Sequence, residues 1–257
     1  MLFRSVWRFK RLARETAVRH GFLASFIAKP FADQPGTGMH WHASLQHAHG
    51  PHAGLNAFVD AQGRDRPQLA HFIGGLQAHA PAAMALLAPW AHSFERLRRS
   101  DASPTDARWG DDDRAVAFRL PASSPANRRI EHRLPGGDAS PYLTLASMLG
   151  TGLLGLQGEL PRQDRGPALP RTPRDALDAL HASAALRDLL GEVLVEQQMV
   201  APRVVGAALD KQKQVKEHKA AESGLIRVNA DKLDEHINLI GELIIASAGA
   251  SLIAQRT

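Results

Sequence analysis

The stretch Arg128-Arg129-Ile130-Glu131-His132-Arg133-Leu134-Pro135 decides how the fold of this chain is interpreted. Residues 129–134 are predicted to form a short strand, whose side chains alternate between two faces. Arg129, Glu131 and Arg133 then share one face, and the residues between them share the other. A carboxylate between two guanidinium groups stays ionised, which suits a site for phosphate, carboxylate and a hard metal ion. A solvated, charged sheet face explains the same run, and the strand alone favours that simpler interpretation.

A second strand is predicted in residues 36–45, Gly-Thr-Gly-Met-His-Trp-His-Ala-Ser-Leu. Its apolar residues alternate toward a core, while His40, His42 and Ser44 face the other way together. Imidazole nitrogen binds divalent metals, and the glycines that come first let a backbone approach a ligand closely. Ordinary sheet histidines on a polar face give the same pattern, so both interpretations stay open.

The remaining pattern predicts alternating helices and strands. Helices are expected over residues 5–20 with Gly21 as the stop, over 67–87 with interruptions at Gly74-Gly75 and Pro81, over 141–156 as a buried helix, and from Pro173 to about residue 190. Strands are expected over 22–28 and 115–120, and residues 91–110 are expected to be irregular.

Composition bounds the class of protein. The 257 residues are 44% hydrophobic, enough for a core, and the absence of cysteine excludes disulfides, thiolate zinc sites and a cysteine nucleophile. No apolar run is long enough to cross a bilayer, and the start lacks a signal-peptide core, so a cytoplasmic protein without membrane contact is expected. The net charge is +5, but aromatic residues do not interleave with the basic ones. A nucleic-acid partner is therefore not expected.

Charge shifts near residue 190, which predicts two domains, 1–190 and 191–257. Residues 191–257 carry 8 Lys and Arg against 9 Asp and Glu, whereas the preceding 190 residues carry 23 against 17. In the second segment Leu233, Ile237, Ile240 and Ile244 recur at spacings of 4, 3 and 4. That seam is typical of one helix in a pair or bundle, and such a helix needs a partner helix.

Four motifs in residues 5–190 together resemble the catalytic region of the glutamine synthetase family. They are Phe-Ile-Ala-Lys-Pro-Phe at 26–31, Gly-Thr-Gly-Met-His-Trp-His-Ala-Ser at 36–44, Asn-Arg-Arg-Ile-Glu-His-Arg-Leu-Pro at 127–135 and Asp-Ala-Ser-Pro-Tyr-Leu at 138–143. The sequence of residues 130–138 is similar to that of the γ-glutamylpolyamine synthetase branch of this family. The resemblance implies an α+β fold, an antiparallel sheet with packed helices. It also implies ATP-dependent phosphorylation of the glutamate γ-carboxylate, followed by attack of an amine or ammonia.

The resemblance also implies roles for individual residues. His40 and Glu131 would bind Mg²⁺ or Mn²⁺. Glutamate would contact Gly36, Arg96 and Arg133. Catalysis would use Arg114 and Arg133, which stabilise the transferred phosphoryl group, and ATP would be bound by His42, Ser44, Arg119 and Arg129. Phosphoryl transfer needs this combination of divalent metal and cationic side chains.

This sequence also departs from the family. Asp101-Ala102-Ser103 stands where the substrate-gating loop usually has a glutamate. The resemblance begins partway through the catalytic domain, and the Glu-x-Glu pair and two further metal carboxylates have no counterpart. One His and one Glu are too few ligands for Mg²⁺ or Mn²⁺, so this polypeptide alone is expected to be inactive.

Residues 190–197 and 224–245 resemble the linker and first dimerisation helix of a chemotaxis histidine kinase. That resemblance implies a homo-oligomer in which the C-terminal helix pairs with another helix. The leading hypothesis is therefore a glutamine-synthetase-type ligase domain with a helical tail. The alternative is a non-catalytic assembly module that oligomerises through its seam helix.

Overall fold

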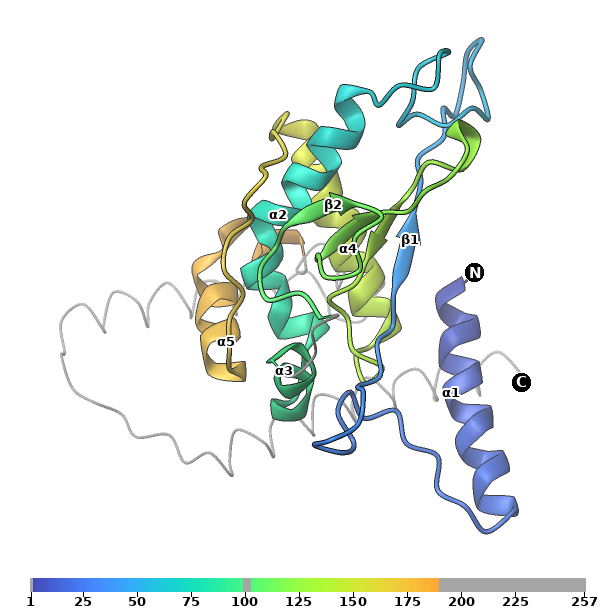
Figure 1. Cartoon of the computed structure of the whole chain (residues 1–257), viewed down its shortest axis with the longest axis vertical. Helices are drawn as coiled ribbons and strands as arrows, with labels where there is room; N and C mark the ends of the chain where they lie inside the picture. The colour runs from blue at the N-terminus through green and yellow to red at the C-terminus, as the bar shows by residue number, and fades with distance from the viewer. Residues whose placement is uncertain (1, 99–102, 190–257) are drawn as a thin grey trace, which may run out of the picture. The chain divides into compact units, whose positions relative to one another are not determined.

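The computed structural model describes residues 2–98 and 103–189, which form a mixed α+β fold (Figure 1). The α+β class is thereby confirmed. Among these residues no helix is both long and apolar enough to span a membrane. The elements are α1 Leu2–Arg19, β1 Trp41–Ala43, α2 Pro67–Leu87, α3 Ala91–Arg98, β2 Trp109–Asp111, β3 Phe118–Leu120, the short 3₁₀ helix η1 Pro125–Asn127, β4 Ile130–His132, α4 Pro141–Gln157 and α5 Pro173–Ala182.

The sheet has the order β1-β4-β3-β2, which places β4 between β1 and β3. Both of these neighbours run antiparallel to β4, and Glu131 pairs with His42 on one side and Arg119 on the other. Side chains directly opposite each other lie on the same face of a sheet. The register therefore brings His42, Glu131 and Arg119 into one row. The next row, Trp41, His132 and Phe118, lies on the core side.

One strand pair departs from the antiparallel sheet that was expected. β2 runs parallel to β3, with Trp109 paired to Phe118 and Asp111 to Leu120. Parallel strands usually need a long crossover connection. Here residues 112–117 suffice, because each strand is only three residues long and the chain has a short distance to return.

α2 is continuous from Pro67 to Leu87, so the interruptions predicted at Gly74-Gly75 and Pro81 are wrong. The glycines serve packing. A Cβ on Gly75 would lie 2.2 Å from the carbonyl oxygen of Thr151, and one on Gly155 would lie 2.6 Å from the Gly75 Cα. The backbones of α2 and α4 thus touch at this point, which only glycine permits. Together these helices supply much of the core, including Phe72, Met84 and Met148.

Three other predictions about elements are wrong. Residues 22–28 form no strand, and residues 91–98 form the helix α3. α4 was expected to be buried all round, but Tyr142, Leu149 and Leu153 on one side of it are 44–50% exposed. Thr172 caps α5 as expected, because its hydroxyl accepts from the Asp175 amide at 3.1 Å.

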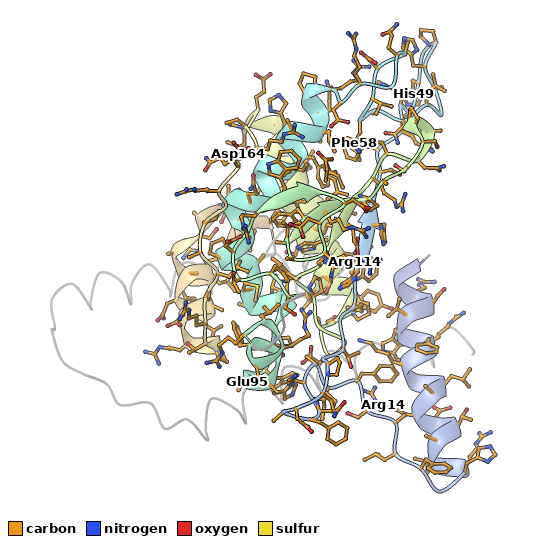
Figure 2. All side chains as sticks on the ribbon, in the orientation of Figure 1. Arg14, His49, Phe58, Glu95, Arg114 and Asp164 are labelled. Atoms are coloured by element: carbon orange, nitrogen blue, oxygen red, sulfur yellow. The ribbon has the colours of Figure 1, made fainter. Side chains whose placement is uncertain are left out.

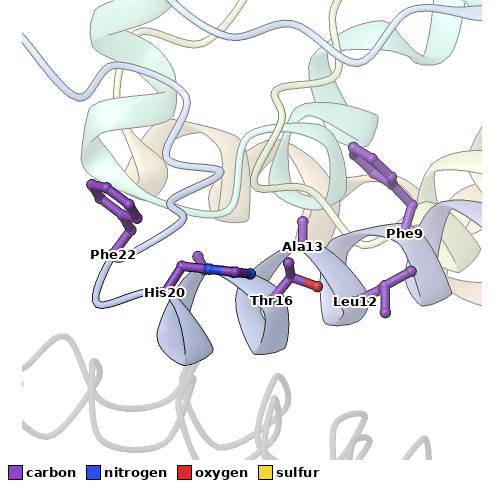
Figure 3. A pocket seen from close by; sticks show the side chains of 7 residues that line it. Phe9, Leu12, Ala13, Thr16, His20 and Phe22 are labelled. Carbon is purple, nitrogen blue, oxygen red and sulfur yellow. The ribbon is translucent and has the colours of Figure 1, made fainter.

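α1 carries an open apolar surface. Figure 3 shows a shallow hollow along it, to which Phe9, Leu12 and Phe22 contribute. These three side chains are 62–73% exposed. Val6 of this helix packs against the core, and the Lys10 ammonium group donates to the Ala139 carbonyl at 3.0 Å. The hollow contains none of the predicted site residues.

Candidate active site

The candidate site is built around Glu131, whose side chain is only 5% exposed. Its Oε1 accepts a hydrogen bond from Arg133 Nη1 at 2.8 Å, and its Oε2 accepts one from Arg119 Nη1 at 2.7 Å. Burial acts to raise the pKa of Glu131, but the hydrogen bonds and charges of the two arginines outweigh it and hold that pKa below its usual value. Glu131 is therefore an ionised carboxylate in a positive environment. The strand pattern predicted Arg129 and Arg133 as its two partners, but Arg119 from β3 takes the place of Arg129, which donates to His42 instead.

His40 lies against the same carboxylate. Its Nδ1 is 3.0 Å from Glu131 Oε1 and 3.4 Å from Arg133 Nη1. Burial, and then the charge of Arg133, lower the pKa of His40, so the imidazole is neutral at pH 7. Neutral imidazole and ionised carboxylate are the protonation states that metal ligands need.

The pair His40 and Glu131 fits one edge of a hard-cation site. The 3.0 Å between Nδ1 and Oε1 is the distance of an Nδ1–H hydrogen bond to the carboxylate. Two neighbouring ligands of an octahedral ion with bonds of about 2.1 Å also lie about 3.0 Å apart, so a cation could replace that proton when it moves to Nε2. In the part of the chain that the structure describes, no group of three or more His, Cys, Asp or Glu side chains is clustered for a metal. The described residues thus offer two donors, and a complete coordination shell requires others.

Two glycines make room beside this pair. A Cβ on Gly36 would lie 2.6 Å from Arg96 Cγ, and one on Gly38 would lie 2.8 Å from His40 Nε2. Arg96 is 6% exposed, donates to the Leu134 carbonyl, and has its pKa lowered by burial to about 10, which leaves it charged at pH 7. Gly36 and Arg96, predicted to contact the same substrate, are therefore in direct van der Waals contact.

The predicted ATP-binding residues lie toward the exposed side of the sheet. Arg129 Nε donates to His42 Nδ1 at 3.2 Å, and burial lowers the pKa of that histidine. Arg119 reaches Glu131 with one nitrogen and Asp112 with another. Ser44 is exposed just beyond β1.

Arg114, predicted to be catalytic, is exposed in the connection between β2 and β3 and is labelled in Figure 2. The hydrogen bond from Arg119 is the main cause of the lowered pKa of Asp112, and the charge of Arg114 adds a small contribution. The other arginines of the prediction, Arg96, Arg119, Arg129 and Arg133, all lie within or beside the network around His40 and Glu131. Arg114 is the one among them that approaches it only from the solvent side, near Asp112.

Sequence reasoning missed Asp112. This residue adopts the left-handed region with φ of 50°, and its carboxylate accepts from Arg119 Nη2 and from the Ala122 amide at 3.4 Å. The run Asp111-Asp112-Asp113 was a visible signal, but three consecutive acids give no indication of which one faces the site. Asp111 instead lies 3.4 Å from Arg128, which also forms two hydrogen bonds with Asp65.

Two parts of the chain match known protein families. Residues 5–204 match the family described as "Glutamine synthetase, catalytic domain", and residues 223–257 match "Signal transducing histidine kinase, homodimeric domain". Gamma-glutamylputrescine synthetase PuuA of Escherichia coli K12 is 38% identical over 192 residues, which are 71% of this chain and 40% of that protein. Glutamine synthetase of Thermococcus kodakarensis is 34% identical over 200 residues, covering 71% of this chain and 44% of the relative.

Among solved structures, "Apo GmaS without ligand" is similar with a TM-score of 0.62 and 30% identity, over 85% of this chain and 50% of that one. The chain thus spans less than half the length of the two curated relatives described above. The expected branch and the join to a kinase-derived segment are both supported by these matches. On the match over residues 5–204, the chain belongs to the glutamine synthetase catalytic-domain family.

Proposed function

We propose that this chain contributes to an ATP-dependent ligase that joins an amine or ammonia to the γ-carboxylate of glutamate through a γ-glutamyl phosphate. The observation that carries this proposal is the convergence on Glu131 of Arg119, Arg133 and His40. Phosphoryl transfer relies on cationic groups and metal ions around the transferring group rather than on a covalent intermediate with the protein. A buried carboxylate, a neutral imidazole and several guanidinium groups meet that need.

In this proposal His40 and Glu131 hold Mg²⁺ or Mn²⁺, which when bound withdraws charge from phosphoryl oxygens. Arg96 and Arg133 hold the glutamate carboxylate and the phosphoryl group beside Gly36, where a larger residue would collide with Arg96. His42, Ser44, Arg119 and Arg129 contact the nucleotide. Arg114 joins Arg133 in stabilising the transferred phosphate, which it must approach from the solvent side.

The acceptor that we favour is a polyamine. The support is the 38% identity to gamma-glutamylputrescine synthetase, against 34% for the glutamine synthetase of Thermococcus kodakarensis. We further propose a cytoplasmic reaction, where ATP and glutamate are abundant. A γ-glutamyl transfer assay that compares putrescine with ammonium as acceptor separates the two branches.

The proposal includes a requirement for further metal ligands. Mg²⁺ prefers six oxygen or nitrogen ligands, and the described residues supply two. We therefore expect that this polypeptide alone does not turn over. Phosphate release above background from purified chain with Mn²⁺, ATP and glutamate would contradict that expectation. Binding is the more direct test of the site: calorimetry should detect Mn²⁺ and nucleotide binding that is lost in His40→Ala and Glu131→Ala.

A second candidate function rests on residues 223–257, which match a homodimeric kinase domain. We propose that this segment pairs with its counterpart in a second chain, so that the protein is a homo-oligomer. The predicted domain boundary at residues 190 and 191 stays a proposal, and the ligase-family match continues to residue 204. Light scattering should show a smaller particle for Ile240→Asp, which places a charge on the predicted seam. An unchanged mass would count against pairing through this seam.

A further inference from the structure

Arg119 lies between two carboxylates of very different exposure. Its Nη1 donates to Glu131 Oε2 at 2.7 Å, and Glu131 has only 5% of its side chain exposed. Its Nη2 donates to Asp112 Oδ1, and that side chain is 58% exposed. Arg119 itself is 16% exposed. The guanidinium group therefore connects a buried acid with a surface acid.

The backbone holds Asp112 in this position. Its φ of 50° lies in the left-handed region, which non-glycine residues seldom adopt, although Asp tolerates it better than most. The Asp112 amide donates to the Leu120 carbonyl at 2.9 Å, and the Ala122 amide approaches its Oδ1 at 3.4 Å. A residue kept in a sparsely populated conformation by its surroundings is a candidate for a functional role.

The contacts of Glu131 create a difficulty for the proposed metal site. Both of its oxygens already accept a charged hydrogen bond, one from Arg119 and one from Arg133. A divalent cation at Glu131 would face two guanidinium groups at close range, and withdrawal of one of them would relieve this repulsion. Arg133 is the more enclosed, with 9% exposure, and it also approaches His40. Arg119 is the more exposed, and it has a second acid to hold.

We propose that Asp112 is a positioning residue that retains Arg119 when a divalent cation takes its place on Glu131. This inference rests on the metal site of the proposed function. A guanidinium group that leaves Glu131 without another partner would remain as an uncompensated charge in a partly buried place, which is costly. Because Asp112 keeps the Nη2 contact, Arg119 can release Nη1 and stay paired. Asp112 thereby favours cation binding without touching the cation.

The test is a titration of the full-length chain with Mn²⁺ at fixed pH and ionic strength. Asp112→Asn keeps the size of the side chain, tolerates the positive φ and removes the charge, and it should weaken Mn²⁺ binding about fivefold. Arg119→Gln removes the competing cation and should strengthen binding about fivefold. Asp111→Asn is the matched control, because it removes the same charge from the adjacent residue, whose partner is Arg128.

The double variant Asp112→Asn/Arg119→Gln tests whether Asp112 acts through Arg119. Relative to Arg119→Gln alone, the added Asp112→Asn change should have no more effect than Asp111→Asn has in the wild-type chain. Equal effects of Asp112→Asn and Asp111→Asn in the wild-type background would overturn the role of Asp112, as would tighter binding by Asp112→Asn. If Glu131→Gln and His40→Ala leave Mn²⁺ affinity unchanged, the metal site of the proposed function fails instead.

Discussion

Glu131 and His132 are neighbours on β4 with almost equal burial, yet the side chain on one face of this strand is charged and the side chain on the other is neutral. Counted over the whole residue, their exposed fractions are 4% and 3%. Glu131 stays charged because two guanidinium groups bind its oxygens. His132 is neutral, since burial lowers its pKa to about 3, with a smaller contribution from His40 once acid has protonated that residue, and its ring stacks on Phe118 with centroids 5.1 Å apart. The partners across the sheet, rather than the depth of burial, decide whether a side chain here keeps its charge.

Removing the charge of Glu131 should have the largest effect on stability. Glu131→Ala leaves Arg119 and Arg133 facing each other without the carboxylate that separates them. Breaking a buried ion pair in this way costs about 3 kcal/mol or more. Urea unfolding followed by circular dichroism measures the loss. A loss below about 1 kcal/mol would mean that water screens this network far better than its burial suggests.

On the His132 face, the free energy of unfolding should depend on pH, because His132 is neutral in the folded chain. The pKa of His132 is about 3 in the folded chain, whereas an exposed histidine in the unfolded chain has a pKa of 6.5. As the pH falls, the unfolded state therefore takes up a proton first, so acid favours unfolding. The stability that depends on neutral His132 is complete above pH 6.5 and is lost as the pH falls toward 3. By pH 4.5 this amounts to about 2–3 kcal/mol.

His132→Phe removes this titration and keeps a ring against Phe118. The difference in unfolding free energy between the variant and the wild type, measured from pH 7 to pH 4.5, isolates the contribution of His132 from that of the other acid-sensitive groups. We expect the variant to lose about 2 kcal/mol less than the wild type over that range. Parallel curves for the two proteins would show that His132 takes up its proton without unfolding.

A smaller effect is expected beside the charged face at Gly36. Gly36→Ala places a methyl group 2.6 Å from both the Ala28 carbonyl oxygen and Arg96 Cγ. Overpacking of this kind costs about 1–3 kcal/mol, and Arg96 must shift to accommodate it. Thermal unfolding measures the loss of stability, and Mn²⁺ titration of the same sample measures any effect on the neighbouring site. Wild-type stability would show that Arg96 moves aside freely and that the glycine is not required for its placement.

The smallest effect on stability is expected at the exposed end of the site. Arg114 is exposed, so Arg114→Ala should change the unfolding free energy by less than about 0.5 kcal/mol. A larger loss in urea unfolding would place Arg114 in the stabilising network rather than at a position available to a ligand.

The sequence predicts the faces of β1 and β4 because alternation along a strand is local. It does not predict which residues meet across the sheet. The contact of Arg119 with Glu131 depends on the register of β3 against β4, and that of Asp112 depends on a left-handed turn. Both are properties of the folded chain. For the same reason the contact of Asp112 with Arg119 could not be distinguished from the contacts of its acidic neighbours.

The errors in the predicted elements have physical causes as well. Residues 22–28 are apolar enough for a strand, but none of the strands that the structure describes pairs with them. Phe26 instead contacts Phe9 of α1, with ring centroids 6.0 Å apart. Residues 91–98 appear irregular because of their charges, but Phe94 and Leu97 are spaced to bury one side of a helix. The glycines of α2 appeared to be interruptions because close contact with α4 is not visible in the sequence.

We propose that the Glu131 face of β4 is a cation-binding ligase site and that the His132 face is structural. The most direct measurement is Mn²⁺ titration of the wild type, Glu131→Gln and His132→Phe, each checked for folding by circular dichroism. We predict that Glu131→Gln loses Mn²⁺ binding by at least about tenfold, because it removes an ionised ligand, while His132→Phe keeps the wild-type affinity. Equal affinity in the wild type and Glu131→Gln would contradict the assignment of the site.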